Sequence, residues 1–191
     1  MNIEIAARAL NQKSAHEGWH YFCDPGLAFS DDFYDRFLEI WRTKVGDRRM
    51  PARSQITPRD LKDVLRNIAL FERIGENPSR YLFRLIGTAL TEIAGHHVTG
   101  KTFEECIPAE LVPRWNECCD LMLACEQPLR FIGRVHLRGR EYLDAEHLYV
   151  PLANDQGVPT FIMCLCRYRP RRSEDERSWE NQIASIPGAL L

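Results

Sequence analysis

Residues 80–105 read RYLFRLIGTALTEIAGHHVTGKTFEE, and the interpretation of the whole chain starts from this stretch. Residues 81–86 alternate in a way that predicts a strand with at least one buried face. After a glycine, apolar residues recur at helical spacing as far as Gly95, a residue type that often ends helices. The sequence TFEE at 102–105 then matches a capping box, with which a further helix begins. The stretch therefore predicts a strand followed directly by two short helices.

The segments on either side of this stretch predict an antiparallel sheet. A turn at residues 75–79 joins two strands into a hairpin, and turns at residues 138–141 and 154–157 join three more strands into a meander. The five expected strands cover residues 67–74, 81–86, 129–137, 142–152 and 160–168. Because helices separate the hairpin from the meander, the fold class is α+β: a five-stranded antiparallel sheet with short helices and one longer helix on one face.

Helices are also predicted beside the sheet. Residues 108–125 form the longer helix, with one apolar face made of Leu111, Trp115, Cys118, Met122 and Cys125. An N-terminal helix is expected to begin at Ser30, which can cap it, and to end near Val45. Its apolar face is wide enough to cover the sheet, a second subunit or both. A short helix is expected from Thr57, by the same capping logic.

The two chain ends carry weaker signals. Residues 1–29 contain no long periodic pattern, and Asp24-Pro25-Gly26 marks a turn. In the tail, Ser173 and Glu176 match a capping box, and three apolar residues follow at helical spacing. Because a short helix with one apolar strip is marginal alone, we expect it to fold back on the domain or to dock on a partner.

Composition limits the classes of function. The chain has 191 residues, of which 45% are hydrophobic, and a net charge of -2, so it can bury one good core and has no general attraction for nucleic acid. It contains no run of about 18 apolar residues and no secretion-signal pattern, which predicts a cytoplasmic protein without a membrane span. The seven cysteines follow neither a disulfide framework nor a paired zinc-site spacing, so reduced, buried thiols are expected.

Four short motifs point to a family. They are RMPARS at 49–54, GTAL at 87–90, TGKT at 99–102 and VPLA at 150–153. In this order they resemble a bacterial group of stand-alone PAS domain proteins, in which an RMPARS segment precedes the sensor core. The resemblance spans roughly residues 41–170. It implies a PAS-like sheet that grips short helices against a small-molecule pocket, with flanking N- and C-terminal helices.

The resemblance divides the chain and suggests pocket residues. The divisions are an N-terminal extension (1–29), an N-terminal helical cap and connector (30–66), a PAS-like sensor core (67–170) and a C-terminal tail with a short helix (171–191). The expected pocket residues are Trp115, Met122, Phe131, Met163, Cys164 and His147. None of them is assigned a catalytic or metal-binding role.

The cofactor is left unknown, because the sequence argues against haem and flavin. Haem-binding relatives use a histidine on or near the long helix, and residues 111–125 contain none. Flavin photosensors use a reactive cysteine in a motif that the surroundings of Cys106 lack. The adjacent His96 and His97 have no nearby cysteine or carboxylate to complete a metal site, so a polar loop is expected there.

The leading hypothesis is a PAS-type sensory or regulatory protein, without catalytic activity, that signals by protein contact. It would form a homodimer through the helix at residues 30–45 and bind a small ligand or an unknown signalling partner. One alternative is a small isomerase or hydratase that uses Asp144 or His147. Another is a DNA-associated regulator that uses the basic connector at residues 47–53 and the basic outer face expected for Arg130, Arg134 and Arg138.

Overall fold

One six-stranded antiparallel sheet forms the centre of the protein, with its strands in the order β1-β4-β5-β6-β2-β3. The computed structural model describes residues 1–29, 31–137, 139–171 and 173–189, the backbone alone for 173–178. The strands are β1 (Tyr21–Asp24), β2 (Ile68–Glu76), β3 (Ser79–Ile86), β4 (Leu129–Arg134), β5 (Leu143–Ala153) and β6 (Pro159–Pro170). The α+β class, with a hairpin and a meander in one antiparallel sheet, is confirmed. The sheet also contains a sixth strand, β1, at one edge, which the sequence did not predict.

Six helices surround the sheet in the described part of the chain. They are α1 (Ile3–His16), α2 (Asp35–Val45), α3 (Thr88–Ala94), α4 (Phe103–Cys106), α5 (Val112–Cys125) and α6 (Ser173–Ala184). Gly95 ends α3 in the left-handed conformation (φ 75°), and Glu105 accepts a hydrogen bond from the Thr102 N–H at the start of α4 (2.7 Å), as the sequence predicted. None of the described helices combines the length and the apolar character that a membrane span requires.

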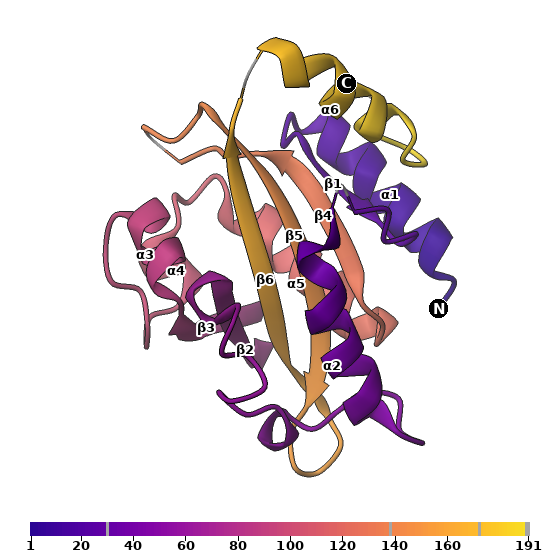
Figure 1. Cartoon of the computed structure of the whole chain (residues 1–191), viewed down its shortest axis with the longest axis vertical. Coiled ribbons are helices and arrows are strands. Elements are labelled where there is room, and N and C mark those ends of the chain that lie inside the picture. Colours follow the sequence, from indigo (N-terminus) through magenta and orange to yellow (C-terminus); the bar gives the residue numbers. More distant parts are fainter. Residues whose placement is uncertain (30, 138, 172, 190–191) are drawn as a thin grey trace.

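The sheet is covered on both faces, and all eleven residues of β5 are buried. On the inner face, Tyr149 belongs to a core that includes residues of α3, α4 and α5. On the outer face, Leu148 and Val150 belong to a second core with Phe37 and Trp41 of α2. Figure 1 shows α2 in front of the sheet and α1 with α6 beside β1. The pattern of residues 142–152 is apolar on both sides because both sides face a core.

Strand β1 and helix α1 lie in residues 1–29, where no long pattern was expected. The helix buries two polar side chains, Asn11 and Ser14, beside Ala7 and Leu10. Asn11 donates to the Cys23 carbonyl (2.9 Å) and accepts from the Cys23 N–H (2.7 Å). Ser14 makes the same two bonds to Tyr21, at 2.7 and 3.2 Å. These side chains occupy the edge of β1 that faces away from β4, so the outermost strand of the sheet is not left open.

Strand β4 does not carry the basic outer face that the sequence predicted. Arg130 is only 1% exposed, and its guanidinium donates to Glu146 (2.7 Å), Asp24 (3.0 Å) and Gln182 of α6 (2.8 Å). The prediction was wrong because α6 folds back and packs its apolar side chains against β1 and β4. Arg138, the last residue of the predicted basic row, lies outside the described residues.

Two helix predictions differ from the structure. The N-terminal helix begins at Asp35, later than expected, because a separate 3-10 turn (Asp32–Tyr34) precedes it. Ser30, the expected cap, lies outside the described residues. The helix predicted from Thr57 is replaced by turns. Asp60 accepts hydrogen bonds from both the N–H and the hydroxyl of Thr57 (2.8 Å each), and such local bonds compete with a regular helix.

Gly133 allows β1 to approach β4 closely. A Cβ atom at this position would lie 2.2 Å from the carbonyl oxygen of His20 and 2.6 Å from the Cα of Tyr21, both backbone atoms. We therefore expect Gly133→Ala to lower the free energy of unfolding by about 3 kcal/mol, measured by urea denaturation. Gly75→Ala in β2 is the matched control, because its nearest atom would be 3.3 Å away, and it should cost about 1 kcal/mol or less. Equal losses for the two variants would contradict this account.

Candidate ligand-binding site on the inner face of the sheet

Two adjoining cavities lie between the inner face of the sheet and helices α3 and α5, with volumes of about 30 and 70 Å³. Five side chains line both cavities: Trp115, Leu137, His147, Tyr149 and Tyr168. Pockets for drug-sized ligands usually measure about 300–1,000 Å³. These cavities are much smaller, so the site as it stands fits a ligand of few atoms.

His147 lines both cavities. The residue is 5% exposed, its Nδ1 lies 2.5 Å from the hydroxyl oxygen of Tyr21, and its Nε2 has no hydrogen-bond partner among the described residues. Burial, reinforced by the positive charge of Arg114, lowers the pKa of His147 from 6.5 to about 3. The imidazole is therefore neutral at neutral pH, and a neutral ring keeps one nitrogen with a free lone pair.

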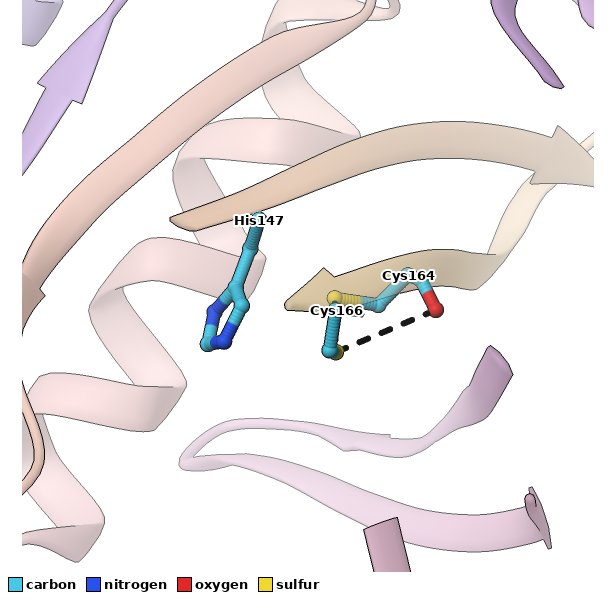
Figure 2. A group of neighbouring side chains, drawn as sticks. All are labelled: His147, Cys164 and Cys166. Atoms are coloured by element: carbon cyan, nitrogen blue, oxygen red, sulfur yellow. Dashed lines mark hydrogen bonds between the residues drawn. The ribbon is translucent and has the colours of Figure 1, made fainter. Parts of the chain in front are cut away.

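Two cysteines of β6 lie beside His147 because of the strand register. His147 pairs directly with Cys166 across β5 and β6, and Cys164 follows two residues along the same strand. Residues two apart on a strand share a face, so all three side chains point toward the inner core. Figure 2 shows them on the same side of the two strands. The two sulfurs are 3.1 Å apart, and burial raises the pKa of the Cys164 thiol well above its usual range.

Arg114 of α5 places a positive charge at the first cavity. It is 7% exposed, donates to the carbonyl of Trp19 (3.2 Å) and lies over the ring of Tyr21, 5.2 Å from its centroid. In the described part of the chain no carboxylate pairs with it. A buried cation without a counter-ion is costly, so this position favours negatively charged or electron-rich groups nearby.

The six residues expected to form the pocket occupy different positions. Trp115 and His147 line both cavities. Three others, Met122, Phe131 and Cys164, belong to the inner core but do not line either cavity. Met163 belongs to the core on the outer face, because it alternates with Cys164 along β6.

Several lining residues were missed by the sequence reasoning. They are Tyr21, Arg114, Tyr149 and Tyr168. Tyr149 could have been found, since it follows His147 at strand spacing. Tyr21 could not, because β1 itself carried no pattern. His96 lines the second cavity from the loop after α3, but it is exposed, and its Nδ1 lies 2.9 Å from the Ala94 carbonyl.

Comparison with known proteins identifies the family. A family model described as PAS domain matches residues 33–166, well over half of the chain. The chain belongs to the PAS domain family. Members of this family are generally sensory and not catalytic. Among curated proteins, none matches the sequence closely enough to count as a relative.

Two solved structures resemble this PAS domain protein. One is the PAS domain of BvgS from Bordetella pertussis, with 20% sequence identity and a TM-score of 0.45, covering 62% of this chain and 88% of that one. The other is a sensory box histidine kinase/response regulator from Burkholderia thailandensis, with 14% identity and a TM-score of 0.39, covering 64% of this chain and 90% of that one.

In this PAS domain protein, the inner-face site is joined to the outer face through β5. Tyr34, which precedes α2, donates from its hydroxyl to the backbone carbonyl of Glu146 (2.7 Å), and that carbonyl belongs to the peptide bond leading into His147. The Glu146 carboxylate accepts from Arg130, which also holds Gln182 of α6. Two adjacent residues of one strand thus face the cavity and the flanking helices.

The same contacts bear on the catalytic use of Asp144 that the isomerase or hydratase alternative requires, and on its neighbour Glu146. Glu146 is 3% exposed and paired with Arg130. Asp144 is 9% exposed and lies 3.2 Å from Arg171. Both carboxylates are therefore occupied by structural ion pairs, and neither lines one of the two cavities.

Proposed function

We propose that the protein is a non-catalytic cytoplasmic regulator that binds a small ligand at the inner-face cavities and reports occupancy through β5 to the flanking helices. The observation that carries this proposal is the position of residues 146 and 147. His147 faces the cavities, while Glu146 is held by Arg130 on the other side and its carbonyl is held by Tyr34. A ligand that moves His147 would strain both contacts.

The proposal needs two packings of the helices against the sheet. Tyr34 connects β5 to α2. Gln182 of α6 is bonded to Arg130, which is bonded to Glu146 of β5, so both flanking helices are connected to the same strand. A ligand can shift such an equilibrium only by its difference in affinity for the two packings. The exposed sides of α2 and α6 are the proposed contact surfaces for a signalling protein or for a second copy of the chain in a homodimer.

Native mass spectrometry and an absorbance spectrum of freshly purified full-length protein would identify the bound molecule. Ala94→Phe fills the second cavity from α3 and should reduce the bound fraction about tenfold or more. The control is Ala9→Phe on α1, away from both cavities. Purified protein without any bound species, together with unchanged mass spectra for both variants, would contradict ligand binding at this site.

Hydrogen exchange tests the transmission step. Binding should change amide protection in α2 and α6, and Tyr34→Phe should abolish the change in α2 because its hydroxyl provides the bond to the Glu146 carbonyl. Tyr142→Phe is the matched control, since Tyr142 is 54% exposed. If ligand binds and neither helix changes its protection, the proposed reporting route is wrong.

A further inference from the structure

A cluster of three soft ligand groups lies at the sheet side of the cavities. One ring nitrogen of His147 and the sulfurs of Cys164 and Cys166 all lie within 4.8 Å of one another. Within the described ranges this is the single group of histidine, cysteine or acidic side chains with such spacing. The PAS assignment does not account for it, and the sequence spacing alone did not suggest a metal site.

We propose that His147, Cys164 and Cys166 bind one zinc ion and leave a fourth coordination position directed at the adjoining cavity. Only one part of the inference rests on the proposed function, namely that this ion, or a small molecule bound to it, is the species that the protein senses. Three protein ligands with an open fourth position are typical of reactive zinc sites, whereas purely structural sites use four.

The histidine already meets the requirements of a zinc ligand. Tyr21 holds Nδ1 in place, and Nε2 is buried without a partner, so the free nitrogen is oriented by a second group as in known zinc sites. A neutral imidazole with one free nitrogen is the form that coordinates a metal. An unpartnered buried nitrogen would otherwise cost stability.

The sulfurs require a small adjustment. Two thiolates on a tetrahedral zinc lie about 3.8 Å apart, given zinc–sulfur bonds of about 2.3 Å. The present separation is 3.1 Å. An entering ion would therefore move the sulfurs apart by less than about 1 Å, within reach of side-chain rotation.

Charge balance selects zinc among thiophilic ions. Binding converts two thiols into thiolates and releases two protons to solvent, so zinc with two thiolates and a neutral imidazole carries no net charge. Copper(I) in the same set would leave one net negative charge that Arg114 would have to balance, whereas zinc needs no counter-ion. Because two protons leave as zinc binds, protons compete with the metal. Zinc affinity should rise about 100-fold per pH unit below the thiol pKa values.

The test uses full-length protein that has been reduced, stripped with a chelator and titrated with zinc against a chromophoric competitor. We expect one zinc per chain, two protons released per zinc, and a thiolate-to-metal charge-transfer band when cobalt(II) replaces zinc. Cys166→Ala and Cys164→Ala should each weaken zinc binding about 100-fold or more, and Tyr21→Phe about tenfold. Cys119→Ala is the matched control, because Cys119 is a buried cysteine of the same core outside the cluster.

Each outcome decides the proposal. Circular dichroism confirms that the variants fold, and Cys166→Ser provides a polar replacement of similar size if the alanine variant does not. The zinc site is wrong if the stripped wild-type protein takes up no zinc, if copper(I) binds and zinc does not, or if Cys119→Ala weakens binding as much as Cys166→Ala. Hydrogen exchange separates the two proposals: zinc that binds without changing α2 or α6 leaves the site intact and overturns the sensory role. If the wild-type protein takes up no zinc but an organic ligand changes the amide protection of both helices, the sensory role stands and the zinc site is wrong.

Discussion

Replacing Arg130 by methionine is expected to lower the free energy of unfolding by about 3–5 kcal/mol. The substitution removes the cation that pairs with two carboxylates, Glu146 (2.6 Å) and Asp24 (3.0 Å), and Glu146 is 3% exposed. Most of the loss comes from the two carboxylates, which stay buried but lose their contact with Arg130, while Glu146 keeps the longer contact with Arg169 (3.8 Å). Urea denaturation followed by far-ultraviolet circular dichroism measures it.

Two comparisons make this expectation specific. Arg84→Met removes an ion pair with Glu72 in which Arg84 is about half exposed, so it should cost about 1 kcal/mol or less. Glu146→Gln should cost less in the Arg130→Met background than in the wild type, because the ion pair with Arg130 is then already lost. Additive effects of the two substitutions would show that Arg130 and Glu146 do not stabilise each other.

Acidification is expected to destabilise the protein through His147. Its pKa is about 3 in the folded chain against 6.5 for the free group. Below pH 6.5 the unfolded chain takes up a proton that the folded chain does not, so stability is complete above that pH and falls as pH decreases toward 3. The contribution to the slope approaches about 1.4 kcal/mol per pH unit.

Urea denaturation from about pH 7.5 to pH 4, under metal-free conditions, isolates this contribution. His147→Gln should remove it, so the difference in stability between wild type and variant should shrink as the pH falls. His16→Gln serves as the control, because His16 is exposed on α1. A difference between wild type and His147→Gln that stays constant across the range would show that His147 does not titrate in this way.

Much of the fold follows from local sequence patterns. The hairpin, the meander and the long helix could be predicted because their apolar residues repeat at strand or helix spacing, and Gly95 and Glu105 mark helix ends through bonds within a few residues. The order of these elements indicated an α+β fold with an antiparallel sheet, and the resemblance carried by the four short motifs implied that the sheet is PAS-like.

The site required the folded chain. Tyr21 lies on a strand whose edge is held by Asn11 and Ser14, polar residues that give no apolar signal. Cys164 and Cys166 form an uninformative pair in sequence, and only the β5–β6 register places His147 beside them. Arg130 appeared exposed in the strand pattern but is buried, because α6 returns from the end of the chain to cover it.

The sequence by itself determined the hairpin, the meander and the long helix, since these depend on the spacing of neighbouring side chains. The tertiary structure alone decided which side chains meet at the cavities and which charges are buried. Those contacts join residues far apart in the chain, such as Tyr21 with His147 and Arg130 with Gln182, and their energies depend on burial that no local pattern records.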